Sequence, residues 1–552
     1  MVKDMRILMG KNAAGKEAVL YPGMANRHGL ICGATGSGKT VSLKVMAEGF
    51  SSMGVPVFLS DVKGDLSGIA VEGQPSEAVS ERLNHLGIED FSFEGFPVCF
   101  WDIFGKTGIP LRTTISEMGP LLLSRILGLT DVQAQILAVV FKIADDEGLL
   151  LIDTKDLKSM LAYVSERNKE YEPVYGKMSP QSLSAIIRAV VSIEAEGGDI
   201  FFGEPALSVE DWLSVDEKGR GRMHILDASS LIGSPRLYAT FLLWMLSELF
   251  ELLPEVGDLE KPKLVFFFDE AHLLFSGAPK ALLEKIEQVV KLVRSKGVGI
   301  YFCTQNPADI PGGILSQLGN KIQHALHAYS PAEQKGVRAA AMAYPVNPEF
   351  DTKDAILSLG TGEAVVSFLD EQGIPTKALK VQILPPQSSF APVEAVLRQR
   401  LVVIDPLYEK YETPVDPDSA FEFLMRRGME IEEAKRQAEE EKRLAKEREA
   451  QAKQEAKEAE KRAKQEAREA EQRARQEAKE AERAEKAKQK EYENRYRVQK
   501  QAIKSVGNTV AGTVGRQVGK ELTKNSGSFG KQLAGNVGAS VGRGLLSTLL
   551  RF

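Results

Sequence analysis

Cysteine is scarce in this chain, which has only Cys32, Cys99 and Cys303 among its 552 residues. Their odd number, wide separation and apolar neighbours predict buried free thiols in a reducing compartment rather than a disulfide framework. No uninterrupted apolar run reaches the roughly 18 residues that a membrane-spanning helix needs. The first ten residues, MVKDMRILMG, are too short and too interrupted for a signal peptide. We therefore expect a cytoplasmic protein.

The chain also has no excess of positively charged side chains. The formal net charge is −6 at pH 7, from 70 basic and 76 acidic side chains. This balance argues against a globally basic nucleic-acid binder, although it leaves open a basic channel that is built locally or across subunits. The hydrophobic content of 43% is enough for a sizeable core, and the length suits two or three domains.

The strongest motif is the octapeptide GATGSGKT at residues 33–40, which fits the phosphate-binding loop pattern G-x-x-x-x-G-K-[ST]. An expected buried strand (residues 29–32) precedes it and an expected helix (residues 41–50) follows. Glycines let successive backbone N–H groups turn inward around a phosphate, and the helix N-terminus adds partial positive charge. We expect ATP phosphates to be bound by Gly33, Ala34, Thr35, Gly36, Ser37, Gly38, Lys39 and Thr40.

Two residues of this loop have individual expected roles. The ammonium of Lys39 is expected to reach the β- and γ-phosphates, and the hydroxyl of Thr40 to bind Mg²⁺. The alternative is an ordinary glycine-rich turn, which the strand on one side and the helix on the other disfavour.

Residues 264–272, LVFFFDEAH, carry a second signal, a buried strand that ends in two carboxylates. In this arrangement, called Walker B, Asp269 is expected to hold Mg²⁺ through a water, and Glu270 to polarise the water that attacks the γ-phosphate. A pair of helix-capping acids is the alternative. The next expected strand, residues 299–304, ends at Gln305, whose amide is well placed to sense the γ-phosphate or to orient the water.

The sequence DVKGD (residues 61–65) follows another expected strand, residues 55–60. Open α/β sheets bind ligands at the carboxyl ends of their strands. Asp61 or Asp65 could therefore touch the water shell of the metal or a substrate, and a tight turn followed by a helix cap is an equal alternative.

Strand and helix patterns alternate in residues 1–110 and again in residues 216–400, which predicts two halves of one α/β core. The second half includes an expected strand at residues 323–329, QHALHAY. Helical spacing prevails in residues 111–215, which predicts an inserted helical subdomain. Residues 401–430 are expected to form a linker.

The rest of the chain changes composition twice. Residues 431–500 are rich in Ala, Glu, Lys and Arg, with three near-copies of an eleven-residue unit that begin at Gln451, Arg462 and Arg473. This period predicts a nearly straight alanine stripe on a long charged helix, either solitary or weakly associated as a coiled coil. The Gly-rich tail, residues 501–552, could dock on a membrane or a partner helix, or be disordered.

The segments GATGSGKT, DVKGD, LVFFFDEAH, RSKGVGIYFCTQNP and LSLGTGEAVV, in this order, resemble the HerA–FtsK superfamily of RecA-like ATPases. They are similar to HerA-like bacterial ATPases of a group once classed as a domain of unknown function. The resemblance covers roughly residues 5–390. It implies a RecA-like P-loop NTPase core with an additional strand, a hexameric ring, and ATP-driven movement of DNA or polypeptide.

The resemblance also implies roles for single residues. Lys39, Thr40, Asp269 and Glu270 keep the roles given above, and Gln305 is similar to the sensor glutamine of the family. Arg294 falls where related ring motors place an arginine that reaches the γ-phosphate of a neighbouring subunit. For Arg294, a charge that stabilises the helix C-terminus is the alternative.

One departure from the family leaves two functions open. HerA translocases usually carry a β-barrel domain before the phosphate loop, whereas here the loop begins at residue 33, so we expect no barrel. The first function is an ATP-hydrolysing, ring-forming motor that acts on DNA. The second is a nucleotide-dependent switch or scaffold whose C-terminal tail binds a protein or membrane partner.

Overall fold

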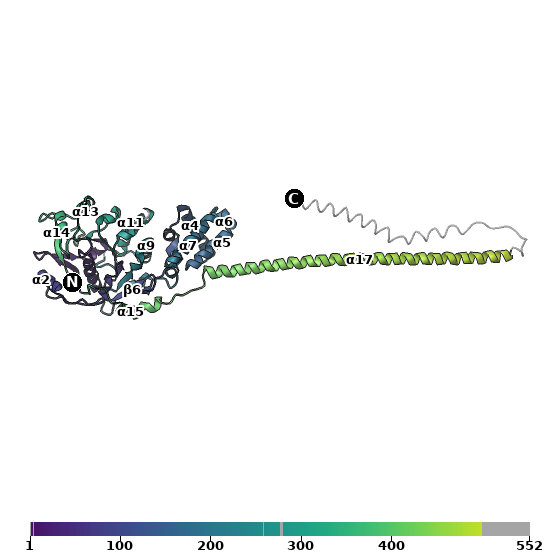
Figure 1. The fold of residues 1–552 in the computed structure, drawn as a ribbon, viewed down its shortest axis with the longest axis horizontal. Helices are drawn as coiled ribbons and strands as arrows, with labels where there is room; N and C mark the ends of the chain where they lie inside the picture. The colour runs from purple at the N-terminus through teal and green to yellow at the C-terminus, as the bar shows by residue number, and fades with distance from the viewer. Residues whose placement is uncertain (1, 4, 234, 258, 276–279, 500–552) are drawn as a thin grey trace. The chain divides into compact units, whose positions relative to one another are not determined.

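The computed structural model describes residues 2–3, 5–233, 235–257, 259–275 and 280–499. The chain divides into two compact units, Met1–Ala434 and Lys435–Phe552. Every described strand belongs to the first unit, and the described part of the second unit is the continuation of helix α17 (Ala420–Gln499) (Figure 1).

A single mixed sheet forms the centre of the first unit, with thirteen strands among the described residues. Its parallel part, in spatial order, is β11 (Asn320–Gln323), β4 (Gly29–Cys32), β10 (Val298–Thr304), β9 (Leu264–Phe268), β5 (Val57–Asp61), β8 (Met223–Asp227), β6 (Val98–Asp102) and β7 (Ile109–Pro110). Antiparallel strands extend the sheet beyond β11: β12 (Glu363–Ser367), β13 (Leu379–Ile383), β2 (Arg6–Lys11), β1 (Val2–Lys3) and β3 (Glu17–Leu20).

This strand order positions the candidate site. Because β4, β10, β9 and β5 are parallel neighbours, their carboxyl ends meet at one edge of the sheet. The phosphate loop, Gln305, the Asp269–Glu270 pair and the loop that starts at Asp61 follow these four ends. Strand β10 lies between the phosphate-loop strand and the Walker B strand, so the additional strand implied by the family resemblance is confirmed.

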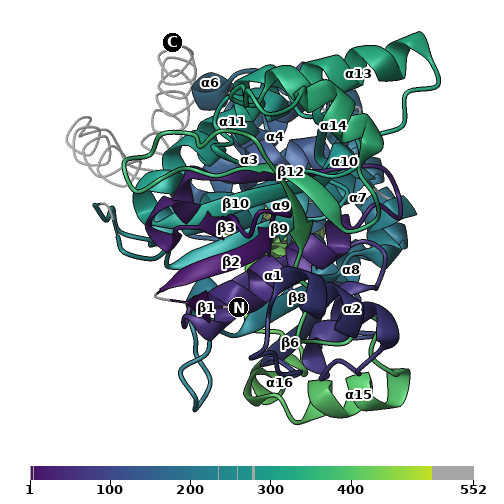
Figure 2. The same cartoon turned by 90° about the vertical axis from the view of Figure 1, so that its left-hand side faces the viewer.

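Helices cover both faces of the sheet (Figure 2). Right-handed crossovers place α1 (Lys39–Ser52) and α2 (Glu77–Leu86) on one face, and α9 (Pro235–Leu252) and α11 (Lys280–Val293) on the other. The other α-helices between β9 and the start of α17 are α10 (His272–Phe275), α12 (Gly312–Leu315), α13 (Pro331–Met342), α14 (Thr352–Ser358), α15 (Ala395–Val403) and α16 (Pro406–Tyr411).

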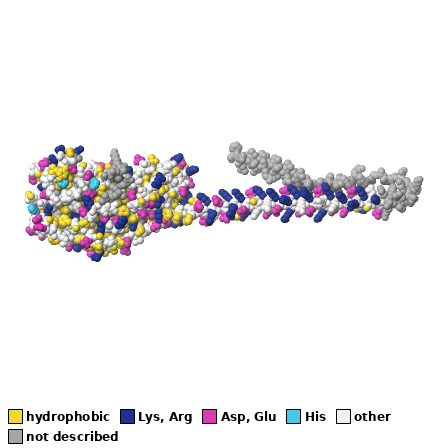
Figure 3. Space-filling view, in the orientation of Figure 1, with side chains coloured by type: hydrophobic (Ala, Val, Ile, Leu, Met, Phe, Trp, Pro, Cys, Tyr) yellow, Lys and Arg dark blue, Asp and Glu magenta, His cyan; other side chains and the backbone are white. Residues whose placement is uncertain are grey.

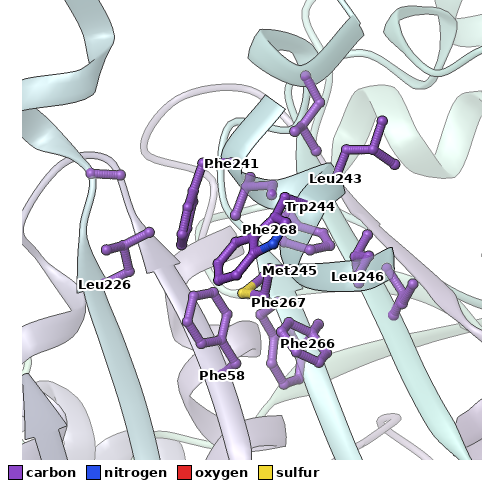
Figure 4. Close-up of a cluster of buried hydrophobic side chains, with 14 of the residues drawn as sticks. Phe58, Leu226, Phe241, Leu243, Trp244, Met245, Leu246, Phe266, Phe267 and Phe268 are labelled. Carbon is purple, nitrogen blue, oxygen red and sulfur yellow. The ribbon is translucent and has the colours of Figure 1, made fainter. Parts of the chain in front are cut away.

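The core under α9 explains why the Walker B strand is so apolar. Phe266, Phe267 and Phe268 of β9 are buried, and aromatic and aliphatic side chains of α9 lie over this strand and its neighbours (Figure 4). Trp244 of α9 is 1% exposed, and the rings of Phe58 and Phe266 lie 5.1 Å apart. A central strand covered on both faces needs a continuous apolar run, because neither face meets water.

Residues 111–215 are mainly helical, as the spacing predicted. Their helices are α3 (Ile115–Ile126), α4 (Asp131–Glu147), α5 (Thr154–Glu166), α6 (Asn168–Tyr175), α7 (Pro180–Ile193) and α8 (Asp199–Phe201). Thr114, Thr130 and Asp153 accept backbone N–H groups at the starts of α3, α4 and α5, which satisfies donors that have no partner within those helices. The domain boundaries given from the sequence remain a prediction.

The expected strand at residues 323–329 is wrong. Strand β11 ends at Gln323, and residues 324–329 form neither strand nor helix. The chain leaves the sheet there because it contacts the phosphate loop: the carbonyl of Ala325 accepts the N–H of Ala34 at 2.8 Å, and the imidazole of His324 bonds to Ser42. These long-range contacts outweigh the local apolar pattern.

The segment 401–430, expected as a linker, contains the end of α15, all of α16 and the first turns of α17 (Ala420–Gln499). Tyr411 is fully buried there, and its carbonyl accepts a hydrogen bond of 2.7 Å from Arg112. Ser419 donates to Asp156 of α5 at 2.6 Å. This segment is therefore packed against the rest of the first unit.

Helix α17 has the regularity that the eleven-residue repeat predicted. Every side chain from residue 432 to 492 is exposed, and acidic and basic side chains alternate along it (Figure 3). Four of its ion pairs recur with a spacing of eleven: Glu449–Lys453, Glu460–Lys464, Glu471–Arg475 and Glu482–Lys486. Each pair has the acid four residues before the base, the favourable orientation on a helix.

The three cysteines are buried and free, as expected. Within the described residues, no helix combines the length and apolarity that a membrane crossing requires. The Gly-rich tail, residues 501–552, lies outside the described part of the chain.

Candidate functional site

The phosphate loop is held in shape by segments on both sides of it. The N–H of Ala34 donates to Ala325, and the carbonyl of Ser37 accepts the N–H of Gly362 at 3.0 Å. Gly36 and Gly38 have φ angles of 76° and 112°, which glycine adopts without strain. The loop conformation is thus set by its own glycines and by two distant parts of the chain.

Lys39 and Thr40 begin α1 and point to different neighbours. The Lys39 ammonium folds back over the loop and donates to the carbonyls of Gly33 and Ala34 at 2.7 and 3.1 Å. The Thr40 hydroxyl donates to Asp65 at 3.2 Å. Asp61 instead accepts the N–H groups of Gly64 and Leu66, so it closes the turn while Asp65 faces the site.

His324 supports the loop from behind. It is fully buried, and burial lowers its pKa to about 4, so its ring is neutral at pH 7. Its Nδ1 faces the carbonyl of Glu363 at 2.9 Å and must donate, so its Nε2 accepts the Ser42 hydroxyl at 2.8 Å. Gly33 has to be glycine here, because a Cβ would lie 2.5 Å from the His324 Cβ.

Asp269 and Glu270 follow β9 next to this loop. Asp269 is 6% exposed, and its Oδ2 is a buried atom with no hydrogen-bond partner. Glu270 has a φ of 46°, a conformation that costs a non-glycine residue free energy and that clusters at functional sites. Its carboxylate contacts Lys63, the Gln305 amide at 3.4 and 3.5 Å, and the His272 Nδ1 at 3.2 Å.

The two carboxylates have opposite pKa shifts. Burial, followed by the negative charge of Glu270, raises the pKa of Asp269 to about 7. Burial also acts to raise the pKa of Glu270, but the hydrogen bond and charge of Lys63 outweigh it and lower that pKa. Glu270 is therefore ionised at pH 7, while Asp269 is close to half protonated.

The residues present fit a magnesium ion. Asp269 Oδ2 and Asp65 Oδ1 are buried carboxylate oxygens without partners, and Thr40 adds a hydroxyl beside Asp65. Among the described residues no group of three or more His, Cys, Asp or Glu could hold a metal alone. Mg²⁺ is commonly bound through one or two carboxylates together with the phosphates of the substrate, and Asp269 and Asp65 supply such carboxylates.

The raised pKa of Asp269 predicts pH-dependent binding of Mg²⁺. Since the metal needs the ionised carboxylate, protons compete with it around and below pH 7. We expect the affinity for Mg²⁺ to fall about fivefold from pH 7 to pH 6 but only about twofold from pH 8 to pH 7. Calorimetric titration of the protein–ADP complex with Mg²⁺ would measure this. Titration of free ADP over the same range corrects for phosphate protonation, and a corrected affinity that is flat with pH would contradict the prediction.

A cavity of about 550 Å³ opens beside this pair, lined by His272, Phe275, Gln305, Ala308, Asp309 and Pro311. Gln305 therefore touches Glu270 on one side and open space on the other. This arrangement gives solvent, or a group from another molecule, a path to the end of β10.

Arg294 is not brought to this site within the chain. It lies in the short turn Arg294–Lys296 that precedes β10, at the amino edge of the sheet, where its charge acts on the buried His28. The seven residues of β10 separate it from Gln305, a span of about 20 Å. Lys39, Thr40, Asp269, Glu270 and Gln305, by contrast, share one edge.

Two residues of the site were missed by sequence reasoning. Lys63 lies within DVKGD, two residues after the end of β5, where its position near a strand end is the signal that could have identified it. His324 lies in the segment that was interpreted as a strand. Both contact partners that are more than 200 residues away in the chain, Glu270 at a separation of 207 and Ser42 at 282.

Comparison with known proteins fits this arrangement. The family model of the helicase HerA-like C-terminal domain matches residues 6–455. The chain belongs to this family. The DNA double-strand break repair helicase HerA of Sulfolobus acidocaldarius is 23% identical to this HerA-like chain over 377 residues, which are 66% of each protein. A probable helicase of Methanocaldococcus jannaschii is 34% identical over 116 residues, 20% of each.

Solved structures similar to this HerA-like protein share little sequence with it. VirB4 of Thermoanaerobacter pseudethanolicus is 14% identical, with a TM-score of 0.46 over 69% of this chain and 97% of that one. The plasmid coupling protein TrwB in complex with ADP and Mg²⁺ is 16% identical, with a TM-score of 0.45 over 72% and 92%.

Proposed function

We propose that this HerA-like protein binds ATP with Mg²⁺ and hydrolyses it. The observation that carries the proposal is the shared sheet edge, where the phosphate loop, Asp269, Glu270 and Gln305 meet. Lys39 and the loop N–H groups hold the phosphates, and Thr40 and Asp269 hold the metal. Bound Mg²⁺ neutralises charge on the phosphates. Glu270 accepts a proton from the attacking water, which Gln305 helps to orient.

We further propose that hydrolysis drives a ring-forming motor that acts on DNA. Membership of the HerA-like family supports this, and so does the name of the Sulfolobus relative, which describes a DNA repair helicase. The chain spans 66% of the length of that relative, so its whole activity is not transferred here. The net charge of −6 requires that a DNA channel be a local basic surface rather than the whole protein.

The test is the steady-state ATPase rate of the full chain without polymer, with double-stranded DNA and with single-stranded DNA. A DNA motor is expected to turn over several-fold faster with one of the two DNA forms, and to elute as a ring on sizing. A measurable basal rate that neither form raises would count against DNA as the substrate while leaving ATP hydrolysis in place.

Arg294 is proposed to complete the site of a neighbouring subunit. Its place at the amino edge keeps it about 20 Å from its own site, so it can act only across a subunit boundary. We expect Arg294→Ala to lose at least about tenfold in kcat. An equimolar mixture with Lys39→Ala should regain activity, because about a quarter of the interfaces in a mixed ring then combine an intact loop with an intact arginine. No recovery above the sum of the two variants would contradict the assignment.

A nucleotide-dependent switch or scaffold is the second candidate. The exposed, charged surface of α17 between residues 432 and 492 favours it, because a helix of this length offers a long binding surface for a protein partner. A switch is expected to bind ATP tightly and to hydrolyse it slowly whichever polymer is present. The DNA stimulation experiment therefore separates the two candidates.

A further inference from the structure

The loop from Asp61 to Leu66 touches both halves of the candidate site. Asp65 accepts the Thr40 hydroxyl from the phosphate-binding side, and Lys63 forms an ion pair with Glu270 on the Walker B side. Asp61 fixes the backbone between them by accepting the N–H groups of Gly64 and Leu66 at 2.7 and 3.0 Å. Lys63 therefore extends from a rigid turn, and only its side chain needs to move for its partner to change.

Both oxygens of Glu270 are occupied. Oε1 accepts the Lys63 ammonium, Oε2 faces the His272 Nδ1 at 3.2 Å, and the Gln305 amide lies 3.4 to 3.5 Å from both. A carboxylate that polarises water must have an oxygen available to accept the water's proton. The Lys63 side chain is 41% exposed and that of Glu270 is 5% exposed, so Lys63 is the partner that can leave without disturbing the core.

Bound ATP would change the charges around the Lys63 ammonium. Lys63 lies near the carboxylates of Glu270, Asp269 and Asp65, whose negative charges attract its ammonium. A triphosphate on the neighbouring loop adds several negative charges, and a flexible lysine is a common phosphate ligand. A Mg²⁺ ion held by Asp269 would also offset the negative charge of that carboxylate. The ammonium then has a stronger partner than the single carboxylate of Glu270.

We propose that Lys63 is a positioning residue that holds Glu270 through the ion pair described above and transfers to the terminal phosphate when Mg·ATP binds. The transfer leaves Oε1 of Glu270 open to the attacking water. Hydrolysis is thereby restricted to a site in which the phosphates are already bound. This inference rests on the proposed ATP hydrolysis at the same site.

A double-mutant cycle of thermal unfolding midpoints tests the pair directly, with Lys63→Met and Glu270→Gln, alone and together, in the full chain. Without nucleotide, the two changes are expected to be non-additive by about 2 °C. With Mg²⁺ and a non-hydrolysable ATP analogue they are expected to be additive. Lys410→Met is the matched control, because Lys410 pairs with Asp211 at 2.6 Å, is 47% exposed, and lies on α16 away from the site. Its cycle with Glu270→Gln should be additive in both states.

Steady-state kinetics give a second readout. Lys63→Met is expected to raise the KM for ATP about tenfold, because it loses a phosphate contact, and to leave kcat within about twofold. Lys63→Arg should restore most of the affinity. A kcat that falls as far as that of Glu270→Gln would show that Lys63 acts on Glu270 during turnover, and would overturn the proposal.

The thermal cycle separates failure of this inference from failure of the proposed function. If the analogue does not raise the thermal unfolding midpoint of the wild-type protein, ATP binding itself is refuted. The proposed transfer of Lys63 to the phosphate is then refuted as well. If the analogue raises the midpoint but the non-additivity persists, the pair is permanent and only the present inference is overturned. Additivity without nucleotide overturns it as well.

Discussion

Replacing Glu270 by glutamine is expected to lower kcat for ATP hydrolysis by about 10²- to 10⁴-fold, the usual contribution of a general base. The amide keeps the shape of the side chain but cannot accept a proton from the water. Glu270 is only 5% exposed and lies two residues after a buried strand, so its carboxylate is held in place by the core. A phosphate-release assay at saturating ATP measures the loss.

Nucleotide binding should survive this change. We expect the Kd of Glu270→Gln for a fluorescent ATP analogue to stay within a few-fold of wild type, because Lys39 and the loop N–H groups are untouched. Glu371→Gln, in an exposed turn, is the control for a glutamate-to-glutamine change and should hydrolyse ATP normally. Wild-type turnover in Glu270→Gln would remove Glu270 from the mechanism.

Replacing Lys39 by alanine is expected to weaken nucleotide binding by roughly 30- to 1,000-fold, which corresponds to about 2–4 kcal/mol for one partner of a buried charge pair. The Lys39 side chain is buried, and its ammonium already lies over the loop, bonded to the carbonyls of Gly33 and Ala34. No other lysine contacts these carbonyls among the described hydrogen bonds.

Equilibrium titration with a fluorescent nucleotide measures the effect on the Lys39→Ala protein. Lys16→Ala, in an exposed hairpin, is the control and should bind like wild type. Because the alanine removes the ammonium that donates to the Gly33 and Ala34 carbonyls, the thermal midpoint is measured alongside. A folded variant with unchanged Kd would refute the role of Lys39.

The predictable parts of the fold are those that neighbouring residues decide by themselves. Residues 264–268 are apolar throughout and form a strand covered on both sides, and the charged repeats form α17 through pairs four residues apart. The strand predicted at residues 323–329 is wrong because distant residues, not neighbouring ones, decide its conformation. Its apolar alternation is typical of a strand. His324 and Ala325 instead form hydrogen bonds with Ser42 and Ala34, at the phosphate loop and the helix after it, so the chain leaves the sheet after Gln323.

The residues of the candidate site also fall into two groups, those that the sequence identified and those whose contacts it could not predict. Lys39, Thr40, Asp269, Glu270 and Gln305 could be named from the sequence because each follows the end of a recognisable strand. The ion pair of Lys63 with Glu270 could not, because 207 residues separate the partners and no local pattern links them. The place of Arg294 at the opposite edge also depends on the direction of β10 in the sheet.

The sequence by itself determined which residues can bind phosphate and metal, since glycine freedom, the lysine charge and carboxylate chemistry are properties of the residues and their immediate neighbours. The tertiary structure decided which of them meet. The order β4-β10-β9-β5 places Gln305 beside Glu270 and brings Lys63 across to the same carboxylate. That order arises from backbone pairing and burial between distant segments, which no stretch of sequence encodes alone.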